Sequence, residues 1–255
     1  IHAFSSFNFA YADREGNIMF VHNSLTPIRK GGYDWQQYLP GDDSSLIWNE
    51  FIAYDDLPQV INPASGYVHS ANQSPFFVSG TADNPNADDY RQEDGFPTRM
   101  TNRAYRGLEL FEQLGPISEK EFFDIKHDKV YSENSRSYAY VQAAIALEGM
   151  DQPYIAAQSL LQDWNYDTDI DNRGAALGTC VLGAEWVAES KGRPVPDVRD
   201  ELIRCTDLLL SKVGKIDPLW GDVNRHIRGD LNLPVGGGPD TLRAIYATGM
   251  EEDGY

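Results

Sequence analysis

Basic residues, cysteines and long apolar runs are all scarce in this chain of 255 residues. Lys and Arg number 21 against 39 Asp and Glu, which gives a formal net charge of −18. Because nucleic acids and anionic membranes are bound through clustered Lys and Arg, this balance argues against both as partners. No apolar run approaches the roughly 20 residues that span a bilayer. The sequence therefore predicts a soluble globular protein.

The two cysteines, Cys180 and Cys205, both lie in segments with helical periodicity. Neither belongs to a Cys-x-x-Cys pair, which argues against a zinc or redox motif. They could form a disulfide in an oxidising compartment or remain two buried thiols, and buried thiols are the favoured interpretation. Because Ile1 is not a natural start, we expect a processed or truncated piece, whose lack of a signal peptide says nothing about export.

The first 75 residues read as β-rich. Aromatic residues alternate with smaller ones from position 7 to 11, a turn follows at 15–17, and an apolar segment follows at 18–21, which together predict a β-hairpin. Residues 66–72 predict a further strand. The polar segment 78–97, rich in Asp, Asn and Pro, predicts a loop.

Residues 98–214 have the apolar spacing of helices. Ser118 and Glu121 form a capping-box motif that opens one of these helices. Residues 215–255 return to turns and short extended pieces. We therefore expect an α+β fold, organised as a single interleaved domain over residues 1–255. The longer predicted helices are residues 102–114, 138–149, 153–163, 173–190 and 196–213.

Seven sequence blocks, in a fixed order along nearly the whole chain, resemble the penicillin amidase family of N-terminal-nucleophile hydrolases. The first matches the family's hairpin motif Asn-x-x-Tyr-Ala-Asp-x-x-Gly-Asn-Ile. The later blocks look more similar to aculeacin and acyl-homoserine-lactone acylases than to penicillin G acylases. The blocks are residues 8–18, 27–29, 57–63, 160–164, 171–176, 221–225 and 228–237.

This resemblance implies an αββα sandwich with a large helical insertion, to which the chain contributes an internal part of the β-subunit. It implies an amide hydrolase that cleaves the linear amide bond of an N-acyl compound: an acyl-homoserine lactone, a lipopeptide or a penicillin-type substrate. The family's nucleophile is an N-terminal Ser whose α-amine serves as base. This chain begins at Ile1, and neither Ser5 nor Ser6 is terminal. The chain alone is therefore expected to be inactive.

The partners implied are the α-subunit and the segment that carries the nucleophile, in a periplasmic or secreted enzyme. A fragment with open sheet edges is also expected to show some self-association. Two other interpretations remain: a module that binds acyl compounds without a nucleophile, and an inert structural fragment.

Two residues match the family's catalytic positions. Asn72 ends the predicted strand before a Ser-Pro turn, and it corresponds to the Asn whose side-chain amide stabilises the oxyanion. The alternative is an Asn that only shapes a turn. Arg103, early in a predicted helix, matches the active-site Arg. Its alternative is a surface Arg, and Arg99 and Arg106 are close competitors for the role.

No redox or organic cofactor is implied, and the histidines lack metal-ligand spacing. His69 is interpreted as structural, on the opposite strand face from Asn72. The acidic residues 167, 169 and 171 begin like an EF-hand loop, but Asn172 and Gly178 break the motif. We expect those acidic residues to turn the chain and cap the next helix. The resemblance also allows a structural calcium ion, which we assign to none of four nearby aspartates: Asp83, Asp88, Asp89 and Asp94.

Overall fold

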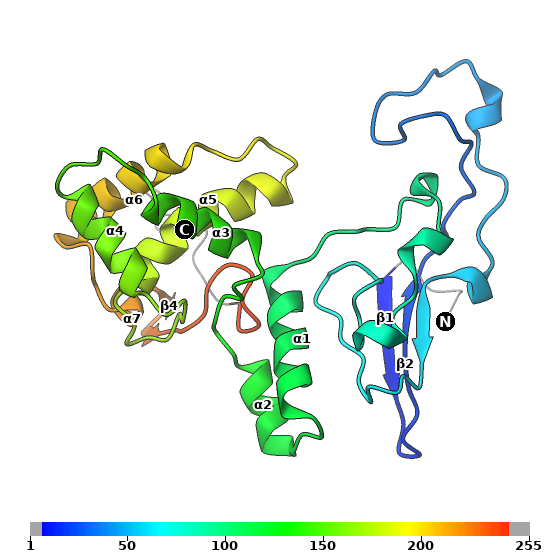
Figure 1. Cartoon of the computed structure of the whole chain (residues 1–255), viewed down its shortest axis with the longest axis horizontal. Coiled ribbons are helices and arrows are strands. Elements are labelled where there is room, and N and C mark those ends of the chain that lie inside the picture. Colours follow the sequence, from blue (N-terminus) through cyan, green and yellow to red (C-terminus); the bar gives the residue numbers. More distant parts are fainter. Residues whose placement is uncertain (1–6, 245–255) are drawn as a thin grey trace. The chain divides into compact units, whose positions relative to one another are not determined.

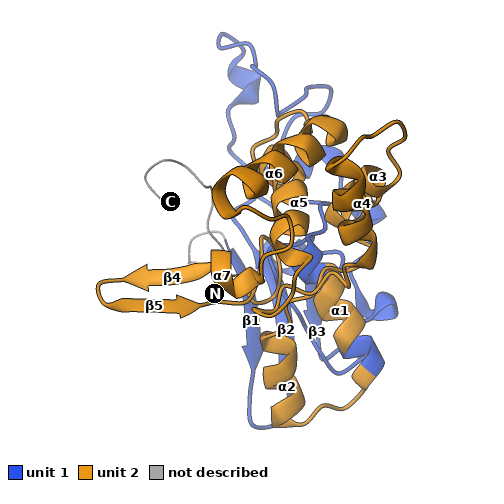
Figure 2. Cartoon of the chain, turned by 90° about the vertical axis from the view of Figure 1, so that its left-hand side faces the viewer, with its two compact units in different colours: residues 1–104, 111–113 blue, residues 105–110, 114–255 orange. Residues whose placement is uncertain are grey.

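The computed structural model describes residues 7–244 of the chain. Its contacts form two compact units: residues 1–104 with 111–113, and residues 105–110 with 114–255. We call them unit 1 and unit 2 (Figure 2). The boundary between them runs through helix α1 (Asn102–Leu114). The single interleaved domain expected from the sequence stays a prediction.

Unit 1 is built on a three-stranded antiparallel sheet in the order β1-β2-β3. Its strands are β1 (Phe7–Ala12), β2 (Ile18–Asn23) and β3 (Gln59–Ile61), visible in Figure 1. The turn between β1 and β2 is closed by the Asp13 carboxylate, which accepts hydrogen bonds from the backbone N–H groups of residues 15 and 17. The predicted hairpin is confirmed.

The strand predicted at residues 66–72 does not form. The backbone N–H of His69 donates to the carbonyl of Val78 at 2.7 Å, but residues 66–72 take no regular strand structure. The chain turns at Asn72, whose φ of +64° is incompatible with an extended strand. The sequence indicated a Ser-Pro turn after Asn72, but the alternation of apolar and polar residues did not show that residues 66–72 themselves are irregular.

The predicted loop at residues 78–97 is turn-rich. It contains three short 3₁₀ turns, η3 (Thr81–Asp83), η4 (Ala87–Asp89) and η5 (Gln92–Asp94). Two more, η1 (Ser44–Leu46) and η2 (Tyr54–Asp56), lie in the long excursion between β2 and β3. A small core of Phe20, Val60 and Val78 joins this region to the sheet.

Unit 2 is mainly helical. Its apolar core surrounds α5, whose Leu177, Val181 and Leu182 are fully buried. The elements are α2 (Glu119–Lys126), α3 (Arg136–Ile145), α4 (Tyr154–Asp163), α5 (Ala175–Ser190), α6 (Val198–Val213), α7 (Trp220–Val223), β4 (Arg225–Arg228) and β5 (Leu231–Pro234).

The helix boundaries largely follow the sequence signals. Helix α1 has its predicted bounds, and Ser118 forms the predicted capping box with Glu121. The cap of α5 differs from the expectation. The side chain of Asn172, and not one of the preceding aspartates, accepts from the backbone N–H groups of Gly174 and Ala175 at 2.9 and 3.1 Å. Asp167 and Asp169 instead accept from nearby backbone N–H groups and turn the chain.

The favoured interpretation of the cysteines as thiols is wrong. Cys180 of α5 and Cys205 of α6 form a disulfide, with their Cα atoms 5.8 Å apart. Helical periodicity placed each cysteine in a helix, but it could not show that α5 and α6 pack together. Within residues 7–244, none of the helices is both long and apolar enough to cross a bilayer.

Candidate active site

Asn72 lies on a tight turn in unit 1, residues 71–77, which we call the Asn72 turn. Its backbone takes the left-handed conformation, which Asn tolerates better than most other non-glycine residues. The residue itself is exposed, whereas its neighbours Ala71 and Gln73 are buried. The turn therefore exposes the Asn72 side chain while the residues on either side of it are buried.

Arg103 lies against this side chain. Its Nη2 donates a hydrogen bond to Oδ1 of Asn72 at 3.2 Å. A guanidinium has only donors, so the Asn72 atom that faces it must be the carbonyl oxygen. The Nδ2 hydrogens are thereby directed away from Arg103. Their orientation suits an amide that donates to a negative oxygen elsewhere.

The two residues predicted from the sequence are thus in contact within one unit. Of their competitors, Arg106 has a different role: its guanidinium pairs with Asp128 in unit 2, with Nε and Nη2 each 3.0 Å from a carboxylate oxygen. Arg99 contributes its backbone carbonyl, which accepts from the N–H of Ser74 at 2.8 Å. This contact supports the Asn72 turn.

A pocket of about 480 Å³ adjoins Asn72. His22 and Asn8 form part of its wall, with Nδ1 of His22 2.8 Å from Oδ1 of Asn8. Burial lowers the pKa of His22, which favours a neutral imidazole. Among residues 7–244, those that line the pocket are all uncharged in this state: Phe7, Asn8, His22, Asn23, Ser70, Asn72, Gln73 and Pro97.

An uncharged polar pocket beside an oriented amide can bind a carbonyl group and stabilise the negative charge that develops on its oxygen. It needs a nucleophile in addition. The first residues, Ile1 to Ser6, lie outside the described part of the chain.

His69 is not among the residues that line this pocket. The centroid of its ring lies 5.8 Å from the centroid of the Phe111 ring. Burial, with a contribution from the positive charge of Arg103, lowers the pKa of His69 to about 4. The argument that placed it on an opposite strand face fails, because there is no strand. Its assignment as a structural residue stays a prediction.

The structural calcium ion allowed by the resemblance stays a prediction. Among residues 7–244, no group of three or more His, Cys, Asp or Glu side chains could hold a metal ion. Asp83 accepts from the backbone N–H groups of Ala64 and Ser65, and Asp94 pairs with Arg91.

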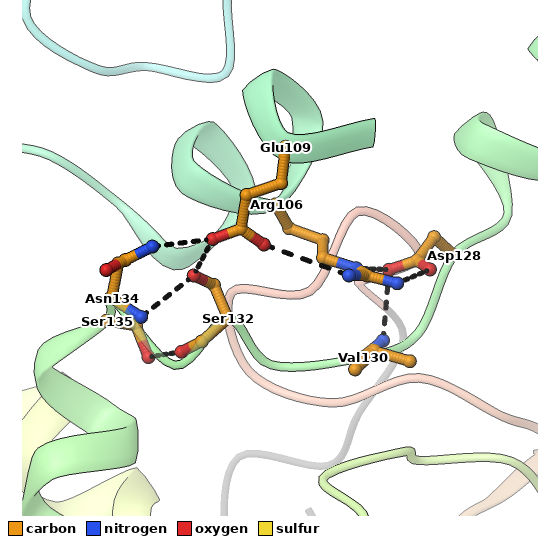
Figure 3. Close-up of polar contacts among 7 residues, drawn as sticks. All are labelled: Arg106, Glu109, Asp128, Val130, Ser132, Asn134 and Ser135. Carbon is orange, nitrogen blue, oxygen red and sulfur yellow. Dashed lines mark hydrogen bonds and ion pairs between the residues drawn. The ribbon is translucent and has the colours of Figure 1, made fainter. Parts of the chain in front are cut away.

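Figure 3 shows a polar network of unit 2 that includes α1, one turn beyond Arg103. Arg106 pairs with Asp128, and Glu109 accepts from Ser132 Oγ at 2.5 Å and from Asn134 Nδ2 at 2.9 Å. These bonds join α1 to the segment that precedes α3. The network links α1 to residues 128–134, so we assign it a structural role.

Unit 2 contains a second pocket, of about 460 Å³, along α5 and α6. Its walls are mostly apolar and include Trp186, Val187 and Leu208. None of the residues matched to the family's catalytic positions lines it.

Sequence reasoning missed the residues that support Asn72, namely Gln73 and Thr101, and the pocket residues Asn8 and His22. Gln73 is only 1% exposed. A polar residue next to a turn gives no sequence signal of such burial. Asn8 was found only as part of the hairpin motif.

Comparisons with known proteins bear on the family and the fold. Residues 1–249 match the family model described as penicillin amidase. Over 68 residues the chain is 38% identical to penicillin G acylase from Escherichia coli, a match that covers 27% of this chain and 8% of that protein. The fold resembles the thermostable penicillin G acylase from Alcaligenes faecalis, with a TM-score of 0.54 and 17% identity.

The structural match covers 82% of this chain and 47% of the solved one, so the chain spans less than half of the relatives it matches. The fold is that of the penicillin acylase type, with mixed helix and strand. With a family match over nearly all of its residues, the chain belongs to the penicillin amidase family.

Proposed function

We propose that this chain is part of an acylase that hydrolyses the amide bond of an N-acyl compound. The observation that carries the proposal is the hydrogen bond from Arg103 to Oδ1 of Asn72, which orients the amide as an oxyanion donor. Membership of the penicillin amidase family supports the same reaction class.

In the proposed mechanism, the hydroxyl of an N-terminal Ser outside this chain attacks the acyl carbon, and its α-amine takes the proton. The carbonyl oxygen becomes negative, and Nδ2 of Asn72 donates to it. The tetrahedral intermediate then expels the amine, which receives the proton, and leaves an acyl-enzyme that water hydrolyses. Arg103 holds Asn72 in place and adds positive potential. Removing one such oxyanion donor typically costs about 2.7–4 kcal/mol of barrier.

The substrates we propose are an acyl-homoserine lactone, a lipopeptide or a penicillin-type amide, so that the enzyme would act in quorum quenching or antibiotic metabolism. Its partners would be the α-subunit and the segment that carries the nucleophile. A periplasmic or secreted location is supported by the Cys180–Cys205 disulfide, because such bonds persist in oxidising compartments.

The test is to express the full-length gene, determine the mass and N-terminal sequence of every mature polypeptide, and assay acid release from a panel of N-acyl substrates. We expect one polypeptide that begins with Ser, and activity that its Ser→Ala variant loses. The 255-residue chain alone should be inactive. An uncleaved precursor without Ser, Thr or Cys at a junction, which binds acyl compounds without turnover, would contradict the proposal and favour the binding module.

A further inference from the structure

Gln73, next to Asn72 in sequence, is a buried side chain whose amide bonds to backbone groups of residues 69, 71 and 77, and its Nε2 also lies 3.4 Å from the ring nitrogen Nδ1 of His69. Its Nε2 donates to the backbone carbonyls of His69 at 3.0 Å and Phe77 at 3.1 Å. Its Oε1 accepts from the backbone N–H of Ala71. One planar amide thus bonds to backbone groups on both sides of Asn72.

These bonds hold a conformation that the chain would otherwise disfavour. Asn72 has a φ of +64°, a region that L-amino acids other than Gly, Asn and Asp rarely adopt. Such a backbone persists only where its surroundings determine it. Residues 66–72 take no regular strand structure, and Gln73 bonds to backbone groups before and after Asn72.

Only an amide side chain of this length has both kinds of group that the turn needs. A glutamate has the same shape but, when ionised, cannot donate to the carbonyls of His69 and Phe77. A leucine fills similar space but cannot hydrogen-bond to the N–H of Ala71 or to the carbonyls of His69 and Phe77. Losing hydrogen bonds to buried backbone groups is costly.

Thr101 ties the same turn to the helix that carries Arg103. Its Oγ1 donates to the carbonyl of Ala71 at 3.2 Å and accepts from the N–H of Ala104 at 3.1 Å. Thr101 is itself buried. Thr101 therefore links the backbone next to Asn72 to the first turn of α1, within unit 1.

We propose that Gln73 is a positioning residue that aims the amide of Asn72 at the reacting carbonyl oxygen. This proposal rests on the proposed function, because it requires Asn72 to act as the oxyanion donor. Gln73 acts through Asn72 and contributes nothing to the reaction without it. A displacement of about 1 Å in a catalytic group is enough to lower a rate by roughly 100-fold.

The experiment measures kcat and KM of the full-length processed enzyme for four variants: Gln73→Leu, Gln73→Glu, Asn72→Ala, and Asn72→Ala combined with Gln73→Glu. We expect each Gln73 variant to lower kcat roughly 10- to 100-fold with little change in KM, because the donor acts in the transition state. In the Asn72→Ala background, the Gln73→Glu change should lower kcat no further. If Gln73→Leu does not fold, the isosteric Gln73→Glu keeps the test open.

Asn84 offers a matched control in the same unit. Its Oδ1 accepts from the backbone N–H groups of Val78 and Ser79 at 2.8 and 3.0 Å, and its Nδ2 donates to the carbonyl of Ser79. It thus holds a turn as Gln73 does, but away from Asn72 in sequence and outside the pocket. Asn84→Leu should lower the melting temperature and leave kcat unchanged.

The outcomes separate the two proposals. If Asn72→Ala lowers kcat but the Gln73 variants lower only the melting temperature, Gln73 is merely structural and this inference fails. It also fails if Gln73→Glu lowers kcat by the same factor in the Asn72→Ala background as in the unmodified enzyme. If Asn72→Ala leaves kcat unchanged, the proposed role of Asn72 fails and the inference fails with it.

Discussion

At the scale of single residues, the Arg103 guanidinium determines which end of the Asn72 amide can donate a hydrogen bond to a substrate. Arg103 donates to Oδ1 of Asn72, so the donor end of that amide is presented elsewhere. The resemblance to a known family picked out both residues from the sequence. It did not pick out Gln73, because burial next to a turn follows from tertiary packing and not from a local pattern.

The same site makes the stability of unit 1 depend on pH. The pKa of His69 falls to about 4, below its ordinary value of 6.5, because of burial and Arg103. Between these values the unfolded chain binds the proton and the folded chain does not. The stabilisation is therefore complete above about pH 6.5 and is lost as the pH falls toward 4.

We expect His69→Gln to reduce this pH dependence. Lowering the pH from 7.5 to 5 should cost the unmodified protein on the order of 1–2 kcal/mol more than the variant. Urea unfolding at both pH values measures the difference. His22, whose pKa burial also lowers, contributes with the same sign and is present in both proteins. Equal losses in the two proteins would show that His69 does not titrate as described.

At the scale of elements, the helices were predictable because their signals are local. Apolar spacing and the capping box at Ser118 act within a few residues. The strand expected at 66–72 and the pairing of Cys180 with Cys205 were not predictable in this way. Both depend on which distant segments pack together, and the periodicity of one segment does not contain that information.

Helix α5 provides a paired test of its packing. A Cβ added at Gly178 would overlap the ring of Trp164, whereas one added at Gly183, on the same helix, meets nothing within 4 Å. Gly178→Ala should therefore lower the free energy of unfolding by about 1–3 kcal/mol. Gly183→Ala should raise it by roughly 0.5–1 kcal/mol, because Ala favours helices. Chemical denaturation measures both, and equal effects would contradict this packing.

The network in Figure 3 should stabilise α1 more than a surface ion pair does. The Arg106 and Asp128 side chains are 21% and 13% exposed, whereas those of Lys120 and Asp124 on α2 are 84% and 62% exposed. Arg106→Ala should cost about 2–4 kcal/mol, because it leaves a half-buried carboxylate unpaired. Lys120→Ala is the control and should change stability by less than about 0.5 kcal/mol. Similar melting temperatures for the two variants would refute this difference.

At the scale of the whole molecule, family membership came from the order of sequence blocks along the chain, and the family match over residues 1–249 confirmed it. The α+β class was likewise predictable, because hairpin and helix signals occupy different parts of the sequence. The division of contacts into two units was not predicted, since no linker of distinctive composition marks it. Substrate choice stays a proposal, because the chain spans less than half of its matched relatives.

The most direct test of the account is the kcat of Asn72→Ala in the full-length processed enzyme. The control is Asn62→Ala, which removes another exposed Asn with positive φ from unit 1, one whose side chain accepts from the backbone N–H of Ile18 and donates to Oδ1 of Asn17. We predict that Asn72→Ala lowers kcat by roughly 100- to 1,000-fold at a nearly constant KM, and that Asn62→Ala leaves kcat within about threefold. A kcat for Asn72→Ala within that same range would contradict the role of Asn72 as oxyanion donor.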